Sequence, residues 1–167
     1  MGQAAHWRAM HGDDVDGVAA VAALAFPDHF ERRACFAERF ALFPQGCFVL
    51  AEGDAVRGYL IAYPWPLGAI PPLNSLLGEL PEARDTWYLH DLALHPDMRG
   101  QGHARPVVER LAGDARGQGA ARIALVSVND SVRFWRGLGF EPVAADATLT
   151  RKLESYGDAS CYMVRAL

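Results

Sequence analysis

A glycine-rich segment, Arg99-Gly100-Gln101-Gly102-His103-Ala104, lies between a run of apolar residues and a helix-like pattern. Glycine lets a backbone approach a ligand closely. The first turn of the following helix directs unpaired N–H groups and the positive end of its dipole toward the same point. The segment is therefore expected to bind an anion such as a phosphate, although a purely structural turn would have the same composition.

Two common nucleotide-binding motifs do not fit this segment. The Walker motif fails because Gly-Lys-Ser/Thr is missing, and the dinucleotide pattern GxGxxG is not met by Gly100-Gln101-Gly102-His103-Ala104-Arg105. An oxidoreductase with a nucleotide site is therefore a weak hypothesis.

The segment resembles the acyl-CoA-binding motif of the GNAT superfamily of N-acyltransferases. Arg99-x-x-Gly102-x-Ala104, after Leu92-Ala93-Leu94-His95-Pro96, matches the usual Gln/Arg-x-x-Gly-x-Gly/Ala. Further along, Ser127-Val128-Asn129-Asp130-Ser131 leads into Phe134-Trp135-Arg136-Gly137-Leu138-Gly139-Phe140, which is similar to the family's second signature. The two motifs in this order are far more specific than either alone.

This resemblance implies that acetyl-CoA is the co-substrate. A strand that splays from its neighbour would pair with the pantetheine arm, and the glycine-rich turn would hold the pyrophosphate. Asn129 would hydrogen-bond the pantetheine or the substrate side, and two aromatic residues would pack near the thiol end. Arg105 would add charge. The implied binding residues are Leu92, Ala93, Leu94, Arg99, Gly100, Gln101, Gly102, His103, Ala104, Asn129, Phe134 and Trp135.

The implied reaction is direct attack of an amine on the thioester, with a backbone N–H stabilising the oxyanion. The amine must lose a proton, and the candidate bases are His90, Asp91 and the nearby Tyr88, because they lie on the strand beside the thioester. Strand alternation places His90 and Asp91 on opposite faces unless a bulge intervenes. The alternative is that Asp91 bonds within the scaffold and His90 is a half-buried strand residue.

The general acid is left open by a departure from the family pattern. Trp135 stands where a Tyr is frequent, and an indole N–H does not supply a proton at relevant pH. Tyr156, Cys161, Tyr162 or water are the alternatives.

The resemblance places the amine acceptor against Phe26 to Phe43 and Tyr63 to Thr86. Aromatic side chains there could line an apolar pocket, and acidic ones could bind a cationic amine. The candidates are Phe30, Tyr63, Trp65 and Trp87, with Glu31, Glu38, Glu79, Glu82 and Asp85.

Periodicity and turn residues predict an α/β (α+β) fold. The GNAT resemblance implies a mostly antiparallel sheet of six to seven strands flanked by helices, with a splayed fourth and fifth strand pair. Expected strands are His6 to Met10, Cys47 to Glu52, Arg57 to Tyr63, Trp87 to Leu94, Ile123 to Val128, one from Phe140, and Ser160 to Arg165. Expected helices are Val15 to Ala25, Phe30 to Phe43, Gly102 to Ala115 and Ser131 to Gly137, and Pro64 to Asp85 is a loop with one helical turn near Leu76-Leu77.

Composition limits the functional classes. At 167 residues we expect one domain, residues 1–167, and the net charge of -4 gives no general attraction to nucleic acid or anionic membranes. No apolar run is long enough to span a membrane and no signal peptide is evident, so we expect a cytoplasmic protein. Three separated cysteines and a His90/His95 pair without a third ligand predict no metal site.

We therefore expect an acyl-CoA-dependent N-acetyltransferase that acts on a primary amine of a small molecule, peptide or protein. The alternative is a non-catalytic acyl-CoA-binding sensor or scaffold, which the missing Tyr makes plausible. Homodimers are common among proteins of this resemblance, often through the late strands.

Overall fold

The computed structural model describes residues 3–129, 131–144, 146–157 and 160–167. Its strands are β1 (His6–Ala9), β2 (Cys47–Glu52), β3 (Ala55–Pro64), β4 (Thr86–Leu94), β5 (Arg122–Ser127), β6 (Glu141–Pro142) and β7 (Cys161–Ala166). Its helices are α1 (Val15–Ala25), α2 (Arg33–Leu42), α3 (Ala104–Gly117), α4 (Val132–Arg136) and α5 (Ala147–Glu154). The described strands form one seven-stranded sheet in the order β1-β2-β3-β4-β5-β7-β6.

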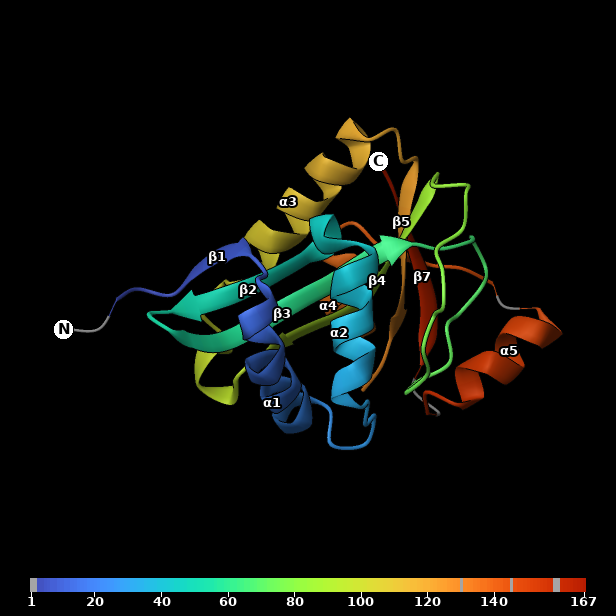
Figure 1. Ribbon diagram of the computed structural model, residues 1–167. Helices are drawn as coiled ribbons and strands as arrows, with labels where there is room; N and C mark the ends of the chain where they lie inside the picture. The colour runs from blue at the N-terminus through green and yellow to red at the C-terminus, as the bar shows by residue number, and fades with distance from the viewer. Residues whose placement is uncertain (1–2, 130, 145, 158–159) are drawn as a thin grey trace.

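Helices cover both faces of this sheet: α1 and α2 lie in front of it and α3 runs behind (Figure 1). The helices α1, α2 and α3 each bury one stripe of residues, such as Val15, Val18 and Val21 on α1, against the sheet. The longest helix, α3, has 14 residues. In the described parts of the chain, no helix combines the length and apolarity needed to cross a membrane.

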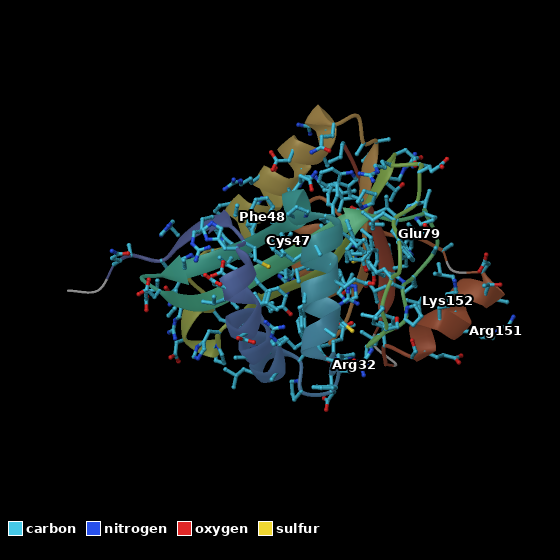
Figure 2. All side chains as sticks on the ribbon, in the orientation of Figure 1. Arg32, Cys47, Phe48, Glu79, Arg151 and Lys152 are labelled. Atoms are coloured by element: carbon cyan, nitrogen blue, oxygen red, sulfur yellow. The ribbon has the colours of Figure 1, made fainter. Side chains whose placement is uncertain are left out.

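Most predicted elements are confirmed within a few residues, and the mixed, mostly antiparallel sheet confirms the predicted fold class. The prediction of a helical turn near Leu76-Leu77 is wrong, because that loop has no helix. Helix α5 was not predicted. Its N-terminus is capped by Asp146, whose carboxylate accepts the Leu149 N–H at 2.7 Å, and its outer side carries the exposed Arg151 and Lys152 (Figure 2).

Strands β4 and β5 separate part of the way along their length. They are the parallel pair in the sheet and are paired only at Thr86–Arg122, Trp87–Ile123 and Tyr88–Ala124. Beyond Tyr88, β4 continues to Leu94 and β5 to Ser127 without pairing to each other. The backbone groups of β4 that face this gap are therefore free to bind another chain-like molecule, as the predicted splayed strand pair requires.

A β-bulge interrupts β4 at His90. Ile61 of β3 is paired with Asp91, but its neighbour Ala62 is paired with Leu89, so His90 is one extra residue without a partner in the register. The bulge cancels the usual alternation at this point, and the side chains of His90 and Asp91 both line the same cavity.

Candidate active site

A cavity of about 490 Å³ opens over the glycine-rich turn between β4 and α3. Gly100 and Gly102 have φ angles of 75° and 79°, which L side chains rarely adopt, and a Cβ on either would meet no atom within 4 Å. The turn is thus an open concave surface lined by backbone. The cavity is lined by Ala25, Phe26, Leu92, Ala93, Leu94, Arg99, Gly100, Gly102, His103, Ala104, Arg105, Phe134 and Leu138.

Contacts from distant elements hold this turn in place. The indole Nε1 of Trp7 in β1 donates a hydrogen bond to the backbone oxygen of His103 at 2.8 Å. Arg105 donates to the backbone oxygen of Gly137, also at 2.8 Å. Gln101, predicted to bind the cofactor, does not line the cavity, and its side-chain amide donates to the backbone oxygen of Asp97 at 2.8 Å.

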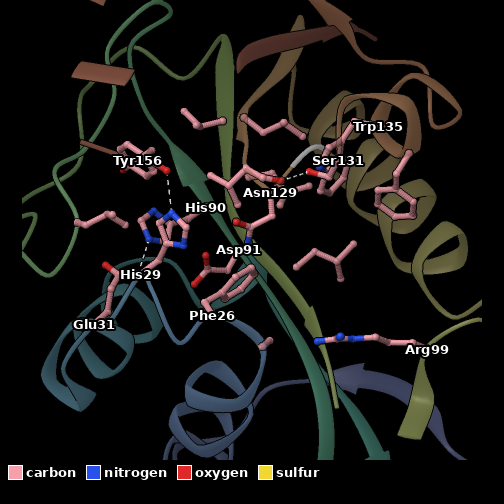
Figure 3. A pocket seen from close by; sticks show the side chains of 18 residues that line it. Phe26, His29, Glu31, His90, Asp91, Arg99, Asn129, Ser131, Trp135 and Tyr156 are labelled. Atoms are coloured by element: carbon pink, nitrogen blue, oxygen red, sulfur yellow. Dashed lines mark hydrogen bonds and ion pairs between the residues drawn. The ribbon is translucent and has the colours of Figure 1, made fainter. Parts of the chain in front are cut away.

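A second cavity, of about 290 Å³, continues from the first. Both cavities share five lining residues: Ala25, Phe26, Leu92, Arg99 and Phe134. Asn129 and Trp135, both predicted binding residues, line the second cavity (Figure 3). The predicted binding residues thus lie along one continuous channel, apart from Gln101.

The segment after β5 forms the wall of the second cavity beside Trp135. Asn129 has a φ of 54°, a left-handed conformation that Asn tolerates better than most residues. The Ser131 hydroxyl donates to the backbone oxygen of Val128 at 2.6 Å. Asp130, part of the predicted motif, lies outside the described residues.

Buried charges lie at the other end of the second cavity. Glu31, in the loop between α1 and α2, accepts a hydrogen bond from Arg39 at 2.8 Å and is bonded to Nε2 of His90 at 2.7 Å. The side chains of these three residues are almost fully buried. Figure 3 shows Glu31, His90, His29 and Tyr156 grouped at this end, away from Arg99.

His90 and Asp91 have different partners. Both ring nitrogens of His90 are engaged, Nε2 with Glu31 and Nδ1 with the hydroxyl of Tyr63 at 3.0 Å. The hydroxyl of Tyr59 donates to Oδ2 of Asp91 at 3.0 Å. Among the described residues, Oδ1 of Asp91 has no hydrogen-bond partner. Asp91 is therefore the group of this pair that can take a proton from a ligand in the cavity.

The two carboxyl groups have opposite pKa shifts. Burial would raise the pKa of Glu31, but the charges and hydrogen bonds of His90 and Arg39 outweigh it and lower the pKa to about 2. Burial raises the pKa of Asp91 to about 6, and the negative charge of Glu31 adds to the effect against the influence of His90, Arg39 and Tyr59. Glu31 is thus a permanent anion, whereas Asp91 titrates close to neutral pH.

Ligand atoms of Glu31, His90 and Asp91 lie within 4.8 Å of one another, which is the spacing of a three-residue metal site. The sequence showed no third ligand beside His90 and His95, and the fold supplies these two carboxylates instead. Glu31 already holds the guanidinium of Arg39, and both nitrogens of His90 have protein partners. These contacts describe a hydrogen-bonded ion-pair network rather than a set of free ligands.

The three side chains considered as general acids are poorly suited to the role. Tyr156 lines the second cavity, but its hydroxyl donates to the backbone oxygen of Pro71, and burial raises its pKa. Burial also raises the pKa values of Cys161 and Tyr162, and neither residue lines either cavity.

Most residues predicted on the acceptor side lie elsewhere. Tyr63 and Trp87 are buried in the core, Trp65 packs against it, and Phe30 is 66% exposed. The carboxylate of Glu38 accepts backbone N–H groups of Leu77 and Gly78. Asp85 pairs with Arg122, whereas Glu79 and Glu82 are exposed. Of the five acidic residues predicted to bind the acceptor, only Glu31 lines the second cavity.

Arg39, Tyr59, Phe26 and His29 also contribute to the site and were not singled out from the sequence. The sequence could have pointed to Arg39, because this arginine falls on the same stripe of α2 as Cys35 and Phe36, which are buried. The others occupy ordinary apolar or loop positions.

Solved structures with very different sequences share this fold. Ard1 from Thermoplasma volcanium is 16% identical with a TM-score of 0.75, and the alignment covers 98% of both chains. The GNAT-like decarboxylase GphF, in complex with isobutyryl-CoA, is 19% identical with a TM-score of 0.80, covering 96% of this chain and 98% of that one.

Sequence comparison gives a match that is shorter but higher in sequence identity, and it also identifies a family. Serotonin N-acetyltransferase 2, chloroplastic, of Oryza sativa subsp. japonica is 44% identical over 50 residues, which are 30% of this chain and 25% of the rice protein. The profile of the acetyltransferase (GNAT) family matches residues 16–140, well over half of the sequence. The chain therefore belongs to the acetyltransferase (GNAT) family.

Proposed function

We propose that the protein is an acyl-CoA-dependent N-acetyltransferase that moves an acetyl group from acetyl-CoA to a primary amine in a ternary complex. The observation that carries this proposal is the continuity of the two cavities. One is lined by the glycine-rich turn and the other contains Asp91, and they share the wall formed by Phe26, Leu92 and Arg99.

The first cavity fits the phosphate and pantetheine parts of acetyl-CoA. The turn at Gly100 and Gly102 offers open backbone at the start of α3, and Arg99 and Arg105 add positive charge. The unpaired edge of β4 beyond Tyr88 offers backbone hydrogen bonds to the amides of pantetheine. The solved relatives include a complex with isobutyryl-CoA, which is consistent with this use of the fold.

The second cavity supports proton removal from the amine. The amine nitrogen attacks the thioester carbon, the new C–N bond forms as the C–S bond breaks, and the electron pair leaves with the sulfur. Asp91 accepts the amine proton on Oδ1, while Tyr59 holds Oδ2. His90 is a positioning residue, because Glu31 and Tyr63 occupy both of its nitrogens. The thiolate is a good leaving group and needs no side-chain acid at Trp135.

A non-catalytic acyl-CoA sensor is the second candidate, and Trp135 in place of a frequent Tyr is the observation that favours it. Residence in the cytoplasm and homodimerisation through the late strands stay predictions.

The test is release of free thiol from acetyl-CoA in the presence of a panel of primary amines. We expect Asp91→Asn to lower kcat about a hundredfold while the Kd of acetyl-CoA, measured by calorimetry, stays unchanged. The wild-type rate should rise with pH through about 6, where Asp91 loses its proton, and this limb should vanish in the variant.

Asp114→Asn, on the exposed side of α3, is the matched control and should behave as wild type. Tight acetyl-CoA binding without turnover on any amine would favour the sensor. Unchanged kinetics in Asp91→Asn would remove Asp91 from the reaction.

A further inference from the structure

Three segments that are distant in sequence meet over the acidic end of the second cavity. Nε2 of His29, in the α1–α2 loop, donates to the backbone oxygen of Tyr156 at 2.8 Å. The hydroxyl of Tyr156 donates to the backbone oxygen of Pro71 in the proline-rich loop. The N–H of Asn74 in that loop donates to Glu31 at 3.1 Å. These bonds join the three segments at the end of the cavity where Figure 3 shows His29, Glu31 and Tyr156, away from Arg99. We call this bonded group, together with Pro71 and Asn74, the roof of the cavity.

The space beneath this roof is small, and apolar side chains make up somewhat more than half of its lining. The cavity of about 290 Å³ is at the lower end of the range for small-molecule sites and must also hold the acetyl group. Leu73, Leu89, Leu125, Val126 and Val128 line its walls. An acceptor with a compact hydrocarbon or aromatic body would fit against these apolar side chains, and we expect the roof to hinder a longer polypeptide.

The charges in the cavity are unfavourable for an acceptor with a carboxylate. Asp91 and Glu31 both line it, and Arg39, which balances Glu31, has no exposed side-chain surface and is not among the lining residues. Arg99 lines the cavity where it joins the first one. Figure 3 shows Arg99 away from Asp91, and the two histidines of the lining, His29 and His90, already bond to Tyr156 and Glu31. A carboxylate close to the reacting amine would therefore face the like charge of Asp91.

We propose that the acceptor is a small primary amine with an apolar body and no carboxylate, and that α-amino acids and the N-terminal amines of peptides are poor acceptors. This inference rests on the proposed acetyltransferase function and narrows its substrate class.

The experiment compares kcat/KM for four amines that share a phenyl group, with acetyl-CoA as donor. Phenethylamine is the expected substrate, phenylalanine adds a carboxylate, phenylalaninamide adds similar bulk without the charge, and the amide of Phe-Ala-Ala extends the chain. We expect phenethylamine to exceed phenylalanine and the peptide by at least about tenfold, with phenylalaninamide between them.

A variant of the roof tests the geometric part separately. His29→Ala removes the bond to Tyr156 and should raise the rate of the peptide relative to that of phenethylamine by at least about threefold. Arg151→Ala, an exposed change on α5, is the control and should leave the ratio unchanged.

Different outcomes would overturn the substrate class and the acetyltransferase function. Equal or faster turnover of phenylalanine or the peptide by the wild-type protein would overturn the proposed substrate class while the acetyltransferase function stands. Absence of thiol release with all four amines, while another primary amine of the wider panel is acetylated, would also overturn the substrate class alone. Absence of thiol release on the whole panel, despite acetyl-CoA binding, would overturn the proposed function and the substrate class with it.

Discussion

The two ends of the channel are built in different ways. At the glycine-rich end, six consecutive residues, Arg99 to Ala104, form the turn and present mainly backbone. At the acidic end, Glu31, Arg39, Tyr59 and Asp91 come from four separate parts of the chain and interact through buried side chains. The first end is local in sequence and the second exists only after folding.

This difference determines what a substitution does. A backbone-lined surface depends on residues that leave space, so adding atoms should destroy its binding without affecting the core. The buried ion pair of Glu31 and Arg39 at the acidic end depends on both partners, so removing one should leave an uncompensated charge and destabilise the fold. We therefore expect added atoms at the glycine-rich end to lower the affinity for acetyl-CoA, and loss of an ion-pair partner at the acidic end to lower the free energy of unfolding.

The largest expected effect is at the glycine-rich end. Gly102→Asp places a side chain and a negative charge where the pyrophosphate is proposed to bind, at a φ that only glycine adopts readily. The Kd of acetyl-CoA, measured by calorimetry, should rise by at least about a thousandfold, while the strained φ should lower the free energy of unfolding by only about 1 kcal/mol. Gly113→Asp, on the exposed side of α3, controls for the added charge. Retained affinity in Gly102→Asp would reject the assignment of this turn.

At the acidic end, Arg39→Met should lower the free energy of unfolding by about 3 kcal/mol, because Glu31 loses its buried guanidinium partner. Urea denaturation measures this change. Arg33→Met, whose partner Asp16 is exposed, is the matched control and should change stability by less than about 1 kcal/mol. A small effect at Arg39 would mean that the network tolerates the loss of a partner, and the contrast between the ends would fail.

A smaller effect separates the two carboxyl groups within the acidic end. The pKa of Glu31 falls from 4.5 to about 2 on folding, so its contribution stabilises the fold above pH 4.5 and is lost as the pH falls toward 2. The pKa of Asp91 rises from 3.8 to about 6, so its ionisation destabilises the fold above pH 6, and this cost disappears below pH 3.8.

At pH 7, Glu31→Gln should therefore lower the free energy of unfolding and Asp91→Asn should raise it, each by about 2 kcal/mol. Denaturation of both variants at pH 7 measures the two signs, and at pH 4 the effect of Asp91→Asn should be nearly gone while most of the effect of Glu31→Gln should remain. If both variants changed the free energy of unfolding in the same direction at pH 7, the two carboxyl groups would not differ as proposed.

The same contrast explains how far the sequence predicts this molecule. The anion-binding turn follows from glycine positions and a helix start within a few residues, and strands such as β2 and β5 follow from apolar runs. The helix α5 was missed because it is only eight residues long and mostly polar, with Leu149 as its buried residue. Glu31 was one of five similar acidic candidates, and nothing local distinguishes it from Glu38. Its pairing with Arg39 and His90 depends on tertiary contacts.

The bulge in β4 has a consequence for how such a site can arise in evolution. In a regular strand, consecutive side chains alternate between the faces, so one of His90 and Asp91 would face away from the cavity. The bulge is a single extra residue, and therefore a single inserted codon is enough to bring two neighbouring side chains to the same cavity. Loss of one codon would separate them again, which makes this pair a one-step gain or loss on an otherwise unchanged sheet.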